Sequence, residues 1–271
     1  MIDASNSASV LSASLSTSQS KLLTALEELG SGSSINSAAD NPAGAAQAES
    51  YSVQLSADAQ AISNIQNSFS LLDTAGSALG QIAQGLQDMR TLSVQAGDAA
   101  LNASDRQAIQ AQIGQIGESI SQIVSSTQFN GQNLLDGSGG TLSLQVGAKA
   151  NETQPLSLAN TSVASFGLSS LDVTTPSGQS TALASLDNAI QQVSSRSSNI
   201  GSLQNSLSSA LSNLSANYNN ISSAKSLVSD TDYAQVLSAM SQANVQQQAS
   251  IAAVASYNST QKNSVLGLLP K

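Results

Sequence analysis

The sequence contains no cysteine, no histidine and no tryptophan among its 271 residues. Without cysteine, the chain has no thiol nucleophile, no disulfide and no thiolate ligand for a metal ion. Without histidine, it lacks the commonest transition-metal ligand, the usual general base and any Ser-His-Asp triad. Only carboxylate chemistry remains, so we expect no enzymatic activity, no cofactor and no metal site.

Close pairs of carboxylates occur at two places, Glu27 with Glu28 and Asp230 with Asp232. Each pair is expected at a helix end or on a solvated face, where no partner base is implied. The glycine cluster from Gly137 to Gly140 lacks the lysine and hydroxyl of a phosphate-binding loop, so we interpret it as a hairpin linker.

Charged residues are scarce as well, at 9% of the chain against about 25% in ordinary soluble proteins. The net charge of −9 leaves no basic surface for nucleic acid or an anionic membrane. No run of 18 apolar residues occurs, and residues 1–7 lack the features of a signal peptide. We therefore expect neither nucleic acid nor a membrane as a partner. If the protein is exported, we expect it to leave the cell without a cleaved signal peptide.

What the sequence does contain is a sustained spacing of three or four between apolar residues, which places them on one stripe of a helix. It predicts five helices: one that ends at Gly30 and Gly32, and others over about 42–96, 104–128, 180–228 and 232–268. Ser104 is the expected N-cap of the third helix. Alternation over 141–146, with a second run at 155–158, predicts a hairpin over about 141–158. For the middle helices, an ordinary helical bundle remains an alternative.

The first and last helices carry narrow apolar stripes and few ion pairs, so neither should be stable alone in water. In the last helix, apolar pairs alternate with the polar pairs Asn244/Gln247 and Asn258/Gln261. Both helices need a partner. The residues expected to provide their assembly contacts are Leu11, Leu15, Leu22, Leu29, Leu237, Met240, Ile251, Val254, Val265 and Leu268.

Three stretches resemble bacterial flagellin, and together they cover nearly the whole chain. The first is residues 19–49, which contain Ile35-Asn-Ser-Ala-Ala-Asp-Asn-Pro-Ala-Gly44. The second is 86–95 with 126–135, followed by the strand at 142–147. The third runs from Asn220-Ile-Ser-Ser-Ala-Lys-Ser226 through 230–234 and 246–249 to Val265-Leu-Gly-Leu-Leu269.

The resemblance implies a mainly α fold, in which the terminal helices (residues 1–40 and 229–271) pair as a coiled coil. Residues 41–228 would form an elongated helical rod with a small β-hairpin, and only a short variable stretch at about 160–180 would stand where larger flagellins carry outer domains. It implies a secreted, extracellular subunit of the flagellar filament, a helical homopolymer. Its partners would be an export chaperone, the filament cap and hook-junction proteins.

Two alternatives remain: a hook-filament junction protein and a surface adhesin of flagellin-like fold. Residues 86–135 favour flagellin over the junction protein, and the short stretch at 160–180 argues against an adhesin.

The chain also departs from the family pattern. Ser33 and Ser34 stand where an apolar and a basic residue are common. In the segment that resembles the epitope for Toll-like receptor 5, Arg90 and Leu92 match, whereas Asp88 replaces a basic residue and Gln112 an acidic one. We therefore expect at most weak recognition by that receptor.

Overall fold

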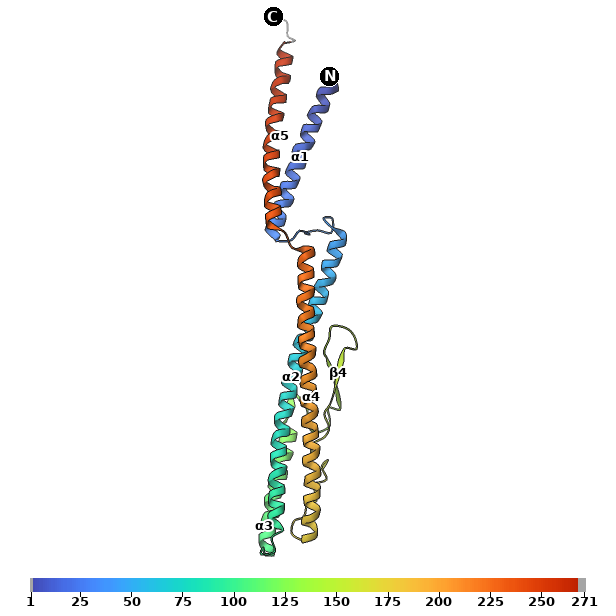
Figure 1. Cartoon of the computed structure of the whole chain (residues 1–271), viewed down its shortest axis with the longest axis vertical. Coiled ribbons are helices and arrows are strands. Elements are labelled where there is room, and N and C mark those ends of the chain that lie inside the picture. Colours follow the sequence, from blue (N-terminus) through green and yellow to red (C-terminus); the bar gives the residue numbers. More distant parts are fainter. Residues whose placement is uncertain (1, 268–271) are drawn as a thin grey trace. The chain divides into compact units, whose positions relative to one another are not determined.

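The computed structural model describes residues 2–267, and the side chains of residues 9–263. The mainly α fold class is confirmed (Figure 1). The elements follow one another in the order α1 (Ile2–Ser31), α2 (Pro42–Ala96), α3 (Ala103–Ser126), β1 (Gln128–Phe129), β2 (Gln132–Asn133), β3 (Thr141–Gln145), β4 (Thr153–Ser157), α4 (Pro176–Ser229) and α5 (Tyr233–Gly267).

Helix α2 begins where the sequence predicts, because Asn41 and Pro42 provide the required chemistry. The Asn41 side chain accepts the backbone N–H of Gly44 at 2.9 Å. Pro42 occupies the first helical position, where its missing N–H is not needed. Helix α4 begins at Pro176, four residues before the predicted start, for the same reason. There Thr175 provides the capping hydroxyl, which accepts the backbone N–H of Gly178 at 3.1 Å.

The predicted cap of α3 is wrong. The N-cap is Asn102, and its side chain accepts the backbone N–H of Asp105 at 3.0 Å, while the Asp105 carboxylate accepts the N–H of Asn102 at 3.3 Å. This reciprocal capping box satisfies two helix-end donors at once. Ser104 is therefore already inside the helix.

The chain divides into two compact units, and each is described by itself. Unit 1 comprises residues 1–55 and 220–271, and unit 2 comprises residues 56–219. The boundaries predicted from the sequence, 40/41 and 228/229, lie at helix ends, whereas the units divide inside α2 and α4. Hydrogen bonds within unit 1 explain the difference, because the last turn of α4 binds the segment before α2: the backbone N–H of Ser34 donates to the Ser229 carbonyl at 2.7 Å.

Unit 2 is built around α2 and α4, which run antiparallel with α3 beside them (Figure 1). Facing side chains fix this direction, because Gln204 of α4 donates to Asp73 of α2 at 2.8 Å, and Asp187 pairs with Arg90 further along. The core between these helices excludes water almost completely. Its largest fully buried side chains are Ile65, Leu72, Leu79, Ile82, Leu86, Met89, Ile113, Ile120, Leu134, Leu135, Leu186 and Leu207.

The β segments of unit 2 are two short antiparallel ribbons. Strands β3 and β4 pair from Thr141↔Ser157 to Gln145↔Thr153. Strands β1 and β2 are joined by Asn130 and Gly131, whose φ angles are +50° and +78°. Asn-Gly is the pair preferred in such a two-residue turn, because both residues must adopt positive φ.

The stretch at 160–180, expected as a short variable region, contributes to the core of unit 2. Phe166, Leu168 and Val173 are buried in it. The Gln110 side chain of α3 fixes the segment in place by donating to the Leu171 carbonyl at 2.8 Å and accepting the Val173 N–H at 2.9 Å.

Candidate assembly interface

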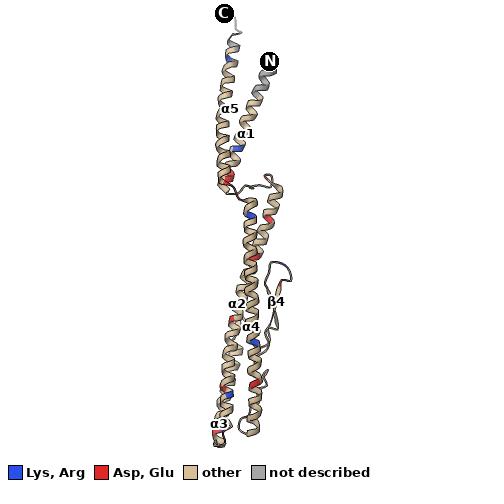
Figure 2. Ribbon diagram, in the orientation of Figure 1, with Lys and Arg blue, Asp and Glu red and all other residues tan. Residues whose placement is uncertain are grey.

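In unit 1, helices α1 and α5 pack side by side and antiparallel (Figure 1). The hydroxyls of Ser14 and Ser250 lie 3.4 Å apart, and Thr231, just before α5, donates to the Glu28 carbonyl near the end of α1. Charged side chains are sparse along both helices (Figure 2). Apolar contact and small polar side chains therefore hold the pair together.

The stripe of α1 that was predicted from the sequence is the stripe that faces α5. Leu11, Leu15, Leu22 and Leu29 are all half-buried. The most buried positions of this stripe are the smaller residues Ser18 and Ala25. Small side chains allow two helices to approach closely, but they bury little apolar area.

The contact of α5 with α1 lies one residue before the predicted stripe position at Leu237, Ile251 and Asn258. Leu237 and Ile251 are 47% and 52% exposed. The side chains that face α1 follow an uninterrupted heptad spacing and mix apolar with polar groups, as the predicted stripe does: Val236, Met240, Ala243, Gln247, Ser250, Val254, Tyr257 and Gln261. Met240 and Val254 are therefore where the sequence placed them. The side chain of Val265 and the whole of Leu268 lie outside the described part of the chain.

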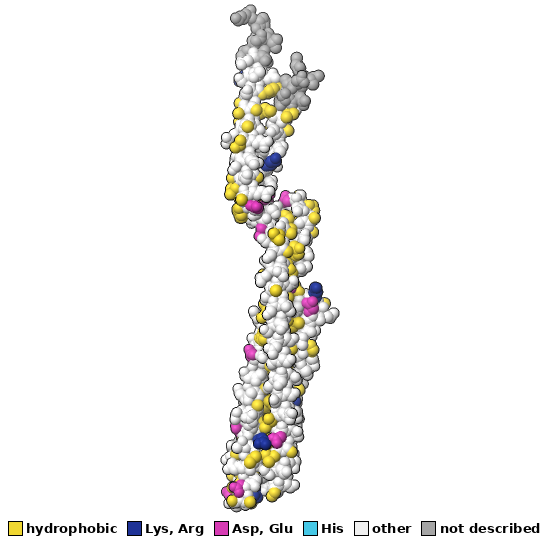
Figure 3. All heavy atoms as spheres, viewed as in Figure 1, with side chains coloured by type: hydrophobic (Ala, Val, Ile, Leu, Met, Phe, Trp, Pro, Cys, Tyr) yellow, Lys and Arg dark blue, Asp and Glu magenta, His cyan; other side chains and the backbone are white. Residues whose placement is uncertain are grey.

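Hydrophobic side chains are visible on the surface of both units (Figure 3), but most of the large exposed ones belong to unit 1. Within the described side chains they are Val10, Leu23, Leu26, Val53, Leu227, Tyr233, Leu237, Val245 and Ile251, whereas unit 2 contributes Val94. Leu227 is 89% exposed. Unit 1 is therefore the part of the described structure that exposes more large apolar side chains, and contiguous groups of such side chains are typical of interaction surfaces.

The α1/α5 pair has two different flanks. At about 100° per residue, Leu26 and Leu23 lie to one side of the α1 stripe, and Tyr233, Leu237 and Ile251 lie to the matching side of the α5 stripe. Because the helices are antiparallel, both sets project from the same side of the pair, and we call these five residues the apolar flank. The opposite side has a groove of about 370 Å³, lined by small and polar side chains such as Thr24, Ala239 and Gln242.

Hydrogen bonds connect the segment between α1 and α2 to the segment between α4 and α5. The sequence alone did not predict these bonds. The Gly32 carbonyl accepts the Thr231 N–H at 3.1 Å. The hydroxyls of Ser33 and Ser34 donate to the Ser229 carbonyl at 3.0 and 3.2 Å. These two serines, which depart from the family pattern, therefore satisfy a carbonyl that the end of α4 leaves without a helical partner.

Carboxylates in unit 1 cap loops and helices. Asp232 accepts the backbone N–H of Ala234 at 3.0 Å and caps α5. Asp40 accepts the N–H groups of Ser37 and Asn36 at 2.7 and 3.0 Å, and these backbone donors lower the pKa of the exposed Asp40 carboxyl.

The described residues contain no group of three or more metal-ligating side chains. No described helix combines the length and apolar content needed to cross a bilayer.

The receptor-like residues lie in unit 2. The Arg90 Nε donates to Asp187 at 2.5 Å, and this hydrogen bond is the main cause of a raised Arg90 pKa. Asp88 is exposed and accepts from the Gln84 amide at 3.0 Å, and Gln112 is exposed on α3. Leu92 is half-buried against the core. Of the four residues, Arg90 and Asp88 both have polar partners within the chain.

Comparison with known proteins agrees with this architecture. The profile of the bacterial flagellin N-terminal helical region matches residues 2–139, and that of the C-terminal helical region matches residues 183–269. A flagellin of Halalkalibacterium halodurans is 34% identical over 247 residues, which is 90% of each chain.

Two solved structures are similar as well. The flagellin of Bacillus cereus is 30% identical, with a TM-score of 0.52 over 56% of this chain and 88% of that one. A putative flagellar hook-associated protein of Vibrio parahaemolyticus, 17% identical, has a TM-score of 0.62 over 70% of this chain and 99% of that one, and this likeness concerns the fold alone.

The architecture is that of a helical structural protein whose two chain ends pair with each other. The chain belongs to the bacterial flagellin family.

Proposed function

We propose that this chain is the subunit of an extracellular bacterial flagellar filament, and that it polymerises through its terminal helices. The observation that carries the proposal is the apolar flank, which the α1/α5 pair leaves open to solvent. Both helices come from the segments that we assign to assembly, residues 1–40 and 229–271.

The α1/α5 contact alone is too weak to keep two isolated helices folded. Ser18, Gln247 and Ser250 occupy stripe positions where a stable coiled coil has large apolar residues. Most helical stability in proteins comes from packing of an amphipathic face against other elements. A neighbouring subunit that covers the apolar flank would add the missing contact. Repeated contacts of this head-to-tail kind do not close, and they generate a helical filament.

Eight of the ten predicted assembly residues then divide into two groups. The half-buried leucines of α1, together with Met240 and Val254, hold α1 against α5 within one subunit. Leu237 and Ile251, which point away from this contact, meet the neighbouring subunit. Val265 and Leu268 keep their predicted role as an expectation only.

A hook-filament junction protein and an adhesin are the alternatives within the same fold. The sequence similarity to a flagellin, at 34% identity, covers 90% of both chains. The stretch at 160–180 is also packed into the core, which leaves little separate domain for a ligand. Both features favour the filament subunit, whose further partners would be an export chaperone, the filament cap and junction proteins. We expect no enzymatic activity and weak recognition by Toll-like receptor 5.

Polymerisation assays test the proposal directly. Purified protein, incubated with and without filament seeds, should form filaments visible by electron microscopy. Leu237→Asp or Ile251→Asp should abolish filaments, because each introduces a charge on the apolar flank. Leu237→Met and Ile251→Leu are matched controls that keep the apolar character and should still polymerise. Normal filaments from both aspartate variants would contradict the role of the flank.

A second pair of variants separates the two groups of residues. Leu15→Asp and Val254→Asp should weaken the contact within the subunit, so that the residual helicity of α1 and α5 in the monomer falls, with little effect on the thermal unfolding of unit 2. The flank variants should instead retain this helicity. Identical losses of helicity in all four variants would overturn the division into two groups.

A further inference from the structure

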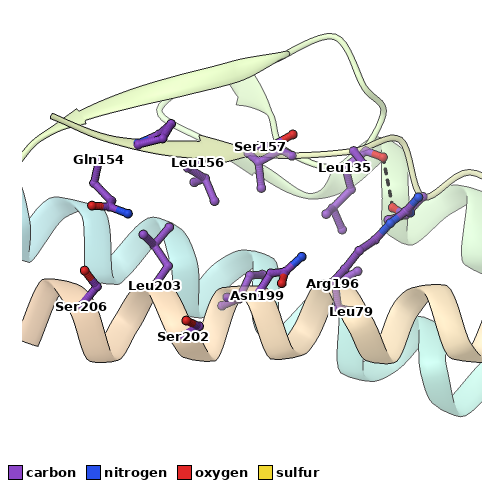
Figure 4. Close-up of a pocket in the computed structure, with 15 residues that line it drawn as sticks. Leu79, Leu135, Gln154, Leu156, Ser157, Arg196, Asn199, Ser202, Leu203 and Ser206 are labelled. Atoms are coloured by element: carbon purple, nitrogen blue, oxygen red, sulfur yellow. Dashed lines mark hydrogen bonds between the residues drawn. The ribbon is translucent and has the colours of Figure 1, made fainter.

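A cavity of about 380 Å³ lies in unit 2 between the β3/β4 hairpin and the two long helices (Figure 4). We propose that it binds a small amphiphile composed of an unbranched aliphatic chain and a carboxylate. The proposal does not depend on filament formation, since every residue that lines the cavity belongs to unit 2.

The walls of the cavity combine aliphatic side chains with polar ones such as Gln154 and Ser206. The strand β4 and the residues that follow it form one wall, and α4 forms the other, with a contribution from α2. In Figure 4, Leu156 points from the hairpin toward the helices, and Leu203 points from α4 toward the hairpin. The aliphatic side chains that line the cavity are Leu79, Leu135, Leu156, Leu158, Ile200 and Leu203. The volume falls in the lower part of the range of small-molecule sites, about 300–1,000 Å³.

One cation stands at the edge of this apolar space. Arg196 is the charged side chain among the lining residues, which include no carboxylate. Its guanidinium is held in one orientation, because Nη1 donates to the Asn160 carbonyl at 2.8 Å and the group lies 5.1 Å from the centre of the Phe166 ring. Asn199 and Ser202, on the same helix, add neutral hydrogen-bonding groups.

The surroundings of Arg196 favour an anion. Desolvation lowers the pKa of this arginine, so its charged form lacks part of the stabilisation that water provides. A carboxylate would provide that stabilisation through a charge-assisted hydrogen bond, which is roughly twice as strong as a neutral one. The leucine and isoleucine side chains that line the cavity favour a hydrocarbon chain, whose burial there removes apolar surface from water.

Isothermal titration calorimetry of the monomeric full-length protein with decanoate, kept below its micelle concentration, tests the proposal. Decanol and decyltrimethylammonium are matched probes with the same chain and a neutral or positive head. We expect decanoate to bind most tightly. Arg196→Gln should weaken decanoate binding about tenfold and leave decanol nearly unchanged, and Arg196→Lys should restore part of the loss.

Two further variants control for general effects. Ser202→Trp places a large ring in the cavity and should abolish binding of all three probes. Arg90→Gln removes an arginine elsewhere in unit 2 and should change nothing. Thermal unfolding of each variant verifies that it is folded, and should Arg196→Gln fail to fold, the order of the three probes on the unmodified protein decides.

Equal affinity for the three probes, or decanoate binding that survives Ser202→Trp, would overturn the proposal. A protein that binds decanoate in this way but never polymerises would contradict only the filament function.

Discussion

The two units differ in how completely they bury their apolar side chains. In unit 2, the long helices bury large aliphatic residues such as Ile65, Leu72 and Leu86 completely. In unit 1, the contact between α1 and α5 uses half-buried leucines around Ser18 and Ser250, and larger apolar residues remain outside it. Unit 2 therefore encloses its own core, whereas the pair of α1 and α5 leaves large apolar side chains exposed.

Removing the terminal segments is the strongest test of this contrast. A chain restricted to residues 40–228 should remain helical and unfold cooperatively, because it keeps the buried core, but it should never polymerise. Circular dichroism and electron microscopy would measure the two properties. In the complete chain, hydrogen exchange should be fast in α1 and α5 of the monomer and slow in the filament. Strong protection of both helices in the monomer would show that the pair is stable without neighbours.

Truncating one leucine in each unit tests the difference in burial through its effect on the free energy of unfolding of unit 2. Leu86→Ala in the core of unit 2 should lower the free energy of unfolding by about 2–5 kcal/mol, because it leaves a cavity. Leu15→Ala is the matched change in the α1 stripe, and it should cost unit 2 nothing that chemical denaturation can detect. Equal losses would mean that the two units unfold together.

Glycines at the junction and in a helix should respond in opposite directions. Gly32 has a φ of +71°, and an added Cβ would lie 3.2 Å from the Tyr233 hydroxyl, so Gly32→Ala should destabilise unit 1 by about 1–2 kcal/mol. Gly80 in α2 has open space around it, and Gly80→Ala should stabilise unit 2 by about 0.5–1 kcal/mol. Thermal unfolding followed separately for each unit would reveal the two signs.

Acid should have a smaller effect, and two loops of unit 2 should contribute to it. Hydrogen bonds from Ser138 and from Thr174 lower the pKa values of Asp136 and Asp172 below the ordinary 3.8. A lowered folded-state pKa stabilises the fold above the unfolded pKa, and this contribution is lost as pH falls through the folded pKa. Asp136→Asn and Asp172→Asn should therefore reduce the fall in melting temperature between about pH 5 and pH 2. An unchanged pH dependence would show that neither loop contributes.

The five helices could be predicted because apolar spacing is set by helix geometry alone, and Asn41 with Pro42 fixed one of the ends. The α5 stripe could not be located so simply. Leu237 is larger than its neighbour Val236, and Ile251 is larger than its neighbour Ser250, and apolar pattern alone favours the larger side chains. Only the approach of α1 selects the small residues instead. The hydrogen bonds from the Ser33 and Ser34 hydroxyls could not be predicted from the sequence either. Their acceptor is the Ser229 carbonyl, which lies 195 residues beyond Ser34 along the chain.

The pairing of Ser14 with Ser250 has a consequence for the order of folding. These residues are 236 positions apart, and closing a flexible loop of that length costs about 5 kcal/mol in chain entropy. The hairpin of β3 and β4 closes over a few residues and faces no such barrier. The α1/α5 contact should therefore form late, after unit 2 has shortened the effective loop. Until residues 233–261 have been synthesised, α1 has no partner, so this contact can form only in a chain whose last helix is present.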